Sequence, residues 1–330
     1  MTERRAGQFE SDQPKPPGVI DTIGAAFSLL NRRPYLIWIP LALDLILWLV
    51  PAVPSGALAA RIATVLESAG SVDAATLDLV RQAGNQTDVL IWLAAFTPSF
   101  LASVGRGGVA APPFAVGAPI RLEWWAVPPA AAFLVVLGVL IGMAYLTIVR
   151  GLVVGEPIAP RAFVARTIRN ALRMLGFVGV VLGLMVMLLI PVGLFTAVLL
   201  GVGLNIAPVV GFVLTVAAVW ALLLLAFPDE AIVLSDAGPL RSIALSATVI
   251  HRDFGPSMRL IIVLTLISMG TPIALRLFAQ SPWSVPFAFV VHAYLATGTA
   301  TAAMLFYGDR IARIAAMAKP EMPVRSREAS

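Results

Sequence analysis

Long apolar runs separated by short polar segments dominate the hydropathy pattern of this chain of 330 residues. A helix needs about 20 apolar residues to cross roughly 30 Å of hydrocarbon. Six runs meet that requirement: about 34–54, 127–149, 174–200, 206–227, 259–280 and 284–307. The pattern therefore predicts an all-α polytopic membrane protein with six transmembrane helices in three hairpins.

A seventh apolar run, 88–104, is shorter than the others and contains Pro98. If it crossed the membrane, the arginines between Arg150 and Arg173 would lie on the outer side. Cytoplasmic loops carry the excess of Lys and Arg in membrane proteins. We therefore expect 88–104 to be a re-entrant or interfacial segment in the outer leaflet.

An amphipathic stretch precedes each predicted hairpin, at 18–33, 161–176 and 238–255. In the third stretch, apolar residues recur at helical spacing and predict one apolar face: Leu240, Ile243, Ala244, Ala247 and Ile250. Basic amphipathic helices of this kind lie in the headgroup layer with the apolar face down. We expect three cytoplasmic interfacial helices; the alternative is ordinary elbow helices that set the tilt of the next span.

The distribution of basic residues predicts the orientation. With six spans and a cytoplasmic N-terminus, 18 of the 23 Lys and Arg residues lie on the cytoplasmic side, as the positive-inside rule requires. We expect a multi-pass protein of the cytoplasmic membrane with both termini in the cytoplasm. The predicted domains are a disordered cytoplasmic tail (1–17), a six-span membrane domain (18–308) with an extracytoplasmic insertion (55–126), and a basic cytoplasmic tail (309–330).

The composition limits the kinds of chemical site and partner that the chain can have. The chain is 59% hydrophobic and 12% charged, against roughly 25% charge in soluble domains. It has no cysteine, which removes disulfides, thiolate metal sites and cysteine nucleophiles. Its basic residues are almost all arginine, which suits anionic headgroups, although a GC-rich genome would give the same bias. The expected partners are the lipid bilayer and anionic phospholipids, with no nucleic acid, no metal and no cofactor.

Two stretches carry a family resemblance. AFSLLNRRPYLIWIPL (26–41) and EAIVLSDAGPLRSIALSATVIHRDFG (230–255) resemble the six-span membrane region that accompanies some bacterial glycerophosphodiester phosphodiesterases, and related stand-alone proteins of unknown function. The resemblance would cover about 18–308. Those enzymes carry their chemistry in a separate soluble barrel, so the resemblance implies the membrane module, not the hydrolase. It supplies no site residues.

Asp44 is the most unusual residue of the predicted spans, because a carboxylate within the bilayer costs a few kcal/mol and usually has a partner. His292, in the last predicted span, is the first candidate for that partner, and Arg276 is the second. An Asp44–His292 pair could relay protons or bind a cation. The alternatives are a structural pair, or a neutral Asp44 hydrogen-bonded to a neighbouring helix.

Other candidates lie at the predicted cytoplasmic surface. Five arginines of the amphipathic stretches and their flanks are candidate headgroup contacts: Arg166, Arg169, Arg173, Arg252 and Arg259. An enzymatic site would have to come from His251, Asp253, Asp229 and Glu230, which is a poor set of groups for catalysis. Gly138 with Gly142, and Gly179 with Gly183, have the spacing of close helix packing.

The sequence thus favours a non-enzymatic module that binds lipid or organises the membrane. Its basic amphipathic stretches and the poor supply of catalytic groups support this hypothesis. A small-molecule or lipid permease that uses Asp44 and His292 is the first alternative. An intramembrane lipid-modifying enzyme is the second.

Overall fold

The computed structural model describes residues 17–70, 72–114, 117–155 and 159–318. These residues form helices and connecting turns, with one isolated bridge between Pro54 and Asp88. The elements are α1 (Val19–Arg32), η1 (Pro34–Ile37), α2 (Trp38–Leu49), α3 (Gly56–Ser68), α4 (Ala74–Gln86), η2 (Val89–Ala94), α5 (Phe100–Val104), η3 (Arg106–Gly108), α6 (Val127–Val154), α7 (Pro160–Gly201), α8 (Ala207–Leu224), α9 (Pro228–Leu234), α10 (Pro239–Arg252), α11 (Phe254–Phe278) and α12 (Val285–Ala318). The predicted all-α fold class is confirmed.

Helices long and apolar enough to cross a membrane occur at five of the six predicted spans: α6, α7, α8 together with α9, α11 and α12. The first predicted span, 34–54, instead forms a shorter apolar helix over Pro34–Leu49. The twelve residues of α2 extend about 18 Å, less than the roughly 30 Å of a hydrocarbon core. Val50 has extended backbone and Pro51 follows it, so the helix ends there.

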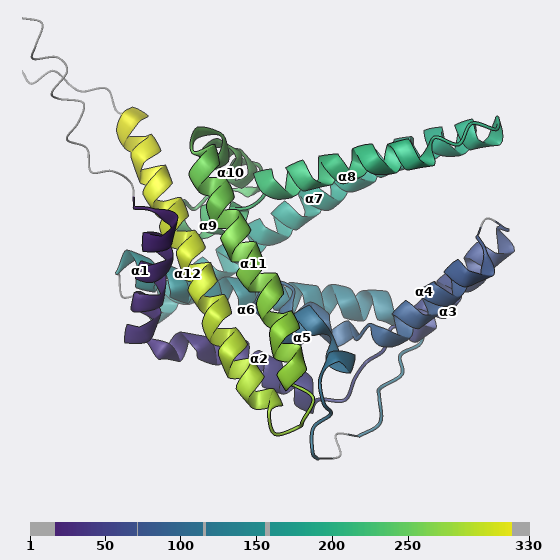
Figure 1. Ribbon diagram of the computed structural model, residues 1–330, viewed down its shortest axis with the longest axis horizontal. Coiled ribbons are helices and arrows are strands. Elements are labelled where there is room, and N and C mark those ends of the chain that lie inside the picture. Colours follow the sequence, from purple (N-terminus) through teal and green to yellow (C-terminus); the bar gives the residue numbers. More distant parts are fainter. Residues whose placement is uncertain (1–16, 71, 115–116, 156–158, 319–330) are drawn as a thin grey trace, which may run out of the picture.

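The centre of the bundle is α12, which packs against α1, α2, α6, α9 and α11. Well over half of its membrane-length stretch is buried, whereas none of the corresponding stretch of α7 or of α8 is buried. Figure 1 shows α7 and α8 running together away from the bundle. Their all-round apolar surface is typical of helices that face lipid.

The second predicted amphipathic stretch is not a separate helix. Residues 161–176 form the beginning of the 42-residue helix α7, which continues without a break into the third predicted span. No glycine or proline occurs between Arg161 and Leu175, so nothing in this part of the sequence stops the helix. The predicted separate interfacial helix at this position is therefore wrong.

The first and third predicted amphipathic helices form as α1 and α10. α1 packs along α12, and Gly298 of α12 gives room for the ring of Phe27. α10 buries Ser242, Ser246, Val249 and Ile250, whereas Leu240 of the predicted apolar face is exposed. The hydroxyl of Ser246 donates to the carbonyl of Leu224 and accepts from the amide of Phe227. It thus satisfies backbone groups at the break between α8 and α9.

Candidate functional site

Residues 88–106 form a loop whose two ends meet at one ion pair, between Asp88 and Arg106. We call them the re-entrant segment after this path; their placement in a membrane stays a prediction. Asp88 Oδ1 accepts the amides of Val53 (3.1 Å) and Leu90 (3.0 Å). Asp88 Oδ2 lies 2.9 Å from Nε of Arg106. The ion pair therefore joins the beginning of the segment to its end.

Two glycines of α6 let the re-entrant segment approach closely. A Cβ atom at Gly138 would lie 2.7 Å from the carbonyl oxygen of Trp92, and one at Gly142 would collide with the carbonyl of Phe96. Gly142 is the sixteenth of the 28 residues of α6. The turn around Phe96 thus lies at about the middle of a membrane-length helix. The spacing of Gly138 and Gly142 therefore allows close contact between a helix and a loop.

Asp44 holds the returning half of the segment. Its side chain is completely buried. It accepts hydrogen bonds from Ser99 Oγ (2.5 Å), the Phe100 amide (3.0 Å) and the Leu101 amide (3.1 Å). Ser99 in turn accepts from the Ala102 amide. Because the first amides of a helix lack partners within that helix, Asp44 and Ser99 together cap α5.

His292 contacts the same short helix from another side. The imidazole and the ring of Phe100 have centroids 5.7 Å apart. None of the hydrogen bonds between described residues joins Asp44 to His292, and Nδ1 of His292 is buried without such a partner. Both predicted residues thus contact α5. Asp44 accepts hydrogen bonds from α5, whereas Nδ1 of His292 has no hydrogen-bond partner among the described residues.

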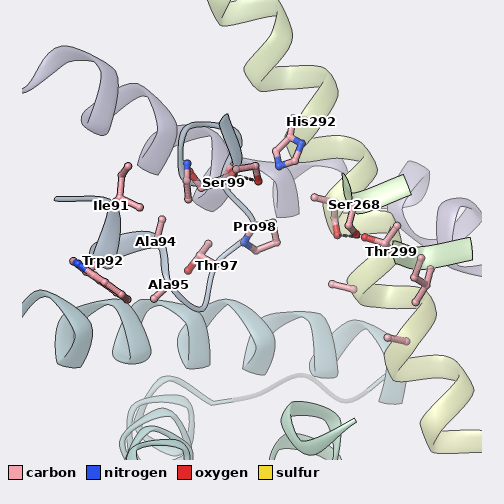
Figure 2. A pocket seen from close by; sticks show the side chains of 16 residues that line it. Ile91, Trp92, Ala94, Ala95, Thr97, Pro98, Ser99, Ser268, His292 and Thr299 are labelled. Carbon is pink, nitrogen blue, oxygen red and sulfur yellow. Dashed lines mark hydrogen bonds between the residues drawn. The ribbon is translucent and has the colours of Figure 1, made fainter. Parts of the chain in front are cut away.

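A cavity of about 630 Å³ lies beside the re-entrant segment. Thr97, Pro98 and Ser99 line it from that segment, Ser268 from α11, and His292 and Thr299 from α12 (Figure 2). Its wall on α12 runs from His292 to Ala303, about 16 Å of helix. Most of the remaining lining is alanine and other apolar side chains. We call this cavity the membrane pocket.

Two buried polar groups in the pocket wall lack hydrogen-bond partners among the described residues. They are Nδ1 of His292 and Oγ1 of Thr97, on side chains only 4% and 5% exposed. A buried polar atom without a partner costs about 1–3 kcal/mol. A ligand with both apolar surface and a polar group could cover the alanines. Both polar atoms are closed off from the cavity in this structure, so the ligand would meet them only after these side chains rotate.

The other predicted candidates lie elsewhere. Arg276 is at the α3–α4 end of the bundle, beside Gly108. Asp253, from the predicted enzymatic set, pairs with Arg310 at 3.4 Å. Asp229 and Glu230 open α9. In the described part of the chain, no group of three or more His, Cys, Asp or Glu side chains could hold a metal ion.

The five candidate headgroup arginines divide into two groups. Arg169 and Arg173 each donate to Oδ1 of Asp236 at 3.1 Å. Their first partner is therefore within the protein, although both remain partly exposed. The other three are partly or fully exposed: Arg166, Arg252 and Arg259. Headgroup contact stays a prediction for all five.

Sequence reasoning missed Thr97 and Ser99. One signal was present for Ser99: a serine directly before an apolar run is a helix-start pattern. Thr97 has no local pattern that marks it, because its role depends on the neighbouring α11 and α12.

Comparisons of this chain with protein-family models, with curated proteins and with solved structures give no match. The resemblance of 26–41 and 230–255 to the membrane region of the phosphodiesterases therefore stays a prediction. Any functional conclusion depends on the geometry of the site itself.

Proposed function

We propose that this protein is a non-enzymatic, multi-pass membrane protein that binds a lipid or another amphiphile in the membrane pocket. The observation that carries the proposal is the pair of buried, unpartnered polar groups on Thr97 and His292, set in a largely apolar wall. The volume falls within the roughly 300–1,000 Å³ of ordinary ligand pockets. The apolar wall suits an acyl chain, and the two polar groups suit an ester, hydroxyl or amide.

We place the protein in the cytoplasmic membrane with both termini in the cytoplasm, because 18 of its 23 basic residues then lie on that side. In this topology α2 makes the first crossing, although its helix is short. The re-entrant segment packs against α2. In this topology it lies at the same depth in the membrane as α2. The α3–α4 hairpin then belongs to the outer side, and the anionic phospholipids are partners of the cytoplasmic arginines.

The permease alternative requires Asp44 to exchange a proton or bind an ion. Both oxygens of Asp44 already accept hydrogen bonds from the start of α5. A carboxylate engaged in this way is suited to holding the re-entrant segment in place. Asp44 therefore supports the pocket as a structural residue, and His292 is the residue that we expect to meet the ligand.

Native mass spectrometry of the protein extracted in mild detergent tests the proposal. Wild-type protein should retain one lipid-class species at fixed stoichiometry. Thr97→Val, which keeps the shape and removes the hydroxyl, and His292→Leu should lose it. His251→Leu is the matched control, because His251 is exposed and distant along the chain. Equal retention by the wild type and both pocket variants would overturn the proposal.

A further inference from the structure

A second cavity lies at the α3–α4 end of the bundle, and its charges are unbalanced. It has a volume of about 660 Å³ and is lined by the end of α4, by residues 104–108 and by Arg276 of α11. We call it the arginine basin. Arg106 and Arg276 line it together with one carboxylate, that of Asp88.

Asp88 neutralises only one of these two arginines. Its Oδ1 is occupied by two backbone amides, and its Oδ2 faces Nε of Arg106. No described residue forms an ion pair with Arg276, whose side chain is exposed. Two guanidinium groups and one carboxylate leave the basin with a net charge of about +1.

Arg106 also has a hydrogen-bond donor without an acceptor among the described residues. Its Nη1 donates to the carbonyl of Val50 at 2.8 Å. Its Nη2 is buried without a hydrogen-bond partner, and Nε faces Asp88 without the alignment of a hydrogen bond. Burial lowers the pKa of Arg106 and the charge of Asp88 opposes that shift, but an arginine stays protonated in proteins. An acceptor is therefore missing at this guanidinium, and because Nη2 is closed off from the basin in this structure, a ligand would reach it only after the side chain turns.

Two glycines keep the backbone beside the arginines free of side chains. Gly105 has φ 72° and ψ 156°, a conformation that only glycine adopts readily. Gly108 lies against Arg276, where an added Cβ would be 3.3 Å from Nε of the arginine. Side chains at these positions would therefore strain the turn or crowd Arg276. Asn85, Gln86 and Thr87 also line the basin.

We propose that the arginine basin binds the anionic phosphate group of a phosphate ester between Arg106 and Arg276. Guanidinium groups bind phosphate oxygens through paired N–H donors, and a phosphodiester carries the single negative charge that the basin lacks. The phosphate can come from a phospholipid headgroup or from a soluble phosphate ester. This site is separate from the membrane pocket and does not depend on the function proposed for that pocket.

The test uses the full chain in nanodiscs and two probes. In phosphatidylcholine nanodiscs, inorganic phosphate is titrated by calorimetry. In nanodiscs with a tenth of phosphatidylglycerol, native mass spectrometry measures enrichment of that lipid on the protein. Arg276→Gln should weaken whichever binding is observed by about tenfold, the usual result of losing a charged hydrogen bond. Arg121→Gln is the control, because Arg121 is exposed and lines a neighbouring cavity.

The outcomes separate the sources of the phosphate. Arg276-dependent enrichment of phosphatidylglycerol supports a headgroup site, and Arg276-dependent phosphate binding supports a soluble ester. Arg106→Lys keeps the charge beside Asp88 and removes Nη2, so it should also weaken binding severalfold. Absence of binding with both probes, or equal loss in Arg276→Gln and Arg121→Gln, would overturn the proposal.

Discussion

Replacing Asp44 tests how the re-entrant segment is held. Asp44→Leu removes both acceptor oxygens and leaves three donors without a partner: the Ser99 hydroxyl and the amides of Phe100 and Leu101. A buried unsatisfied donor costs about 1–3 kcal/mol. The free energy of unfolding should therefore fall by at least about 3 kcal/mol. Asp44→Asn keeps one oxygen and should cost about 1–3 kcal/mol.

The assay is unfolding in mixed micelles with a rising fraction of dodecyl sulfate, followed by tryptophan fluorescence. Trp48 on α2 and Trp92 on η2 report on the region around Asp44. The chain has no cysteine, so Ala102→Cys introduces one thiol on α5 in the pocket wall. Its labelling by a water-soluble maleimide should accelerate when Asp44 is replaced, because α5 then separates from α2.

Asp78→Leu is the control for this prediction. Asp78 is exposed and pairs only with the exposed Arg81 among the described residues, and such surface ion pairs contribute about 0–1 kcal/mol. The reasoning is refuted if the free energy of unfolding of Asp44→Leu lies within about 0.5 kcal/mol of the wild-type value and if the thiol of Ala102→Cys is labelled equally fast with and without Asp44→Leu. Asp44 would then not hold α5.

Two further predictions concern the packing of α6 and the hydrogen bonds of α10. Gly142→Ala should destabilise the protein by about 1–3 kcal/mol, because its Cβ would meet the carbonyl of Phe96. Gly179→Ala should be nearly neutral, since no described residue outside its own stretch of helix lies within 4 Å of the added Cβ. The same unfolding titration compares them, and equal effects would contradict the contact. Ser246→Ala should lower the free energy of unfolding by about 1–3 kcal/mol, because the buried Phe227 amide loses its acceptor. Thr248→Ala, at an exposed hydrogen bond, should lower it by less than about 0.5 kcal/mol. Thermal unfolding in detergent ranks the two variants, and the opposite order would contradict this role of Ser246.

Hydropathy predicted the long helices because a membrane helix satisfies its own backbone and needs only length and apolar side chains. α11 ends at Phe278 and α12 begins at Val285, each within two residues of the predicted bounds 280 and 284. α12 continues to Ala318, eleven residues past the predicted 307. The short α2 shows the limit of this logic. Its apolar run was predicted to continue to residue 54, but the helix ends at Leu49 and the backbone is extended at Val50.

The buried faces were harder to predict than the helices. In a bilayer the apolar side of a helix can face lipid, so the face that packs on protein is often the one with small residues. α10 illustrates this point, since it buries Ser242 and Ser246 while Leu240 is exposed. Ile250 is the member of the predicted apolar face that is buried, so hydropathy alone did not define the face that packs on protein.

The site could be predicted only in part, because its residues are distant in sequence. Asp44 and His292 were recognisable as polar groups in apolar runs, but the partner of Asp44 lies 55 residues away, at Ser99. Glycine spacing alone could not distinguish Gly142, which meets the re-entrant segment, from Gly183, which meets nothing within 4 Å. Such pairings depend on tertiary packing.

The most direct test of the membrane pocket is photocrosslinking with a phospholipid that carries a diazirine on its acyl chain. The protein is crosslinked in native-like nanodiscs, and the modified peptides are mapped by mass spectrometry. Our account predicts crosslinks concentrated on 91–103 and 292–303, reduced in Thr97→Val relative to the wild type, above a uniform background on the exposed α7 and α8. Crosslinks confined to α7 and α8, with none on the pocket wall, would contradict lipid binding in this pocket.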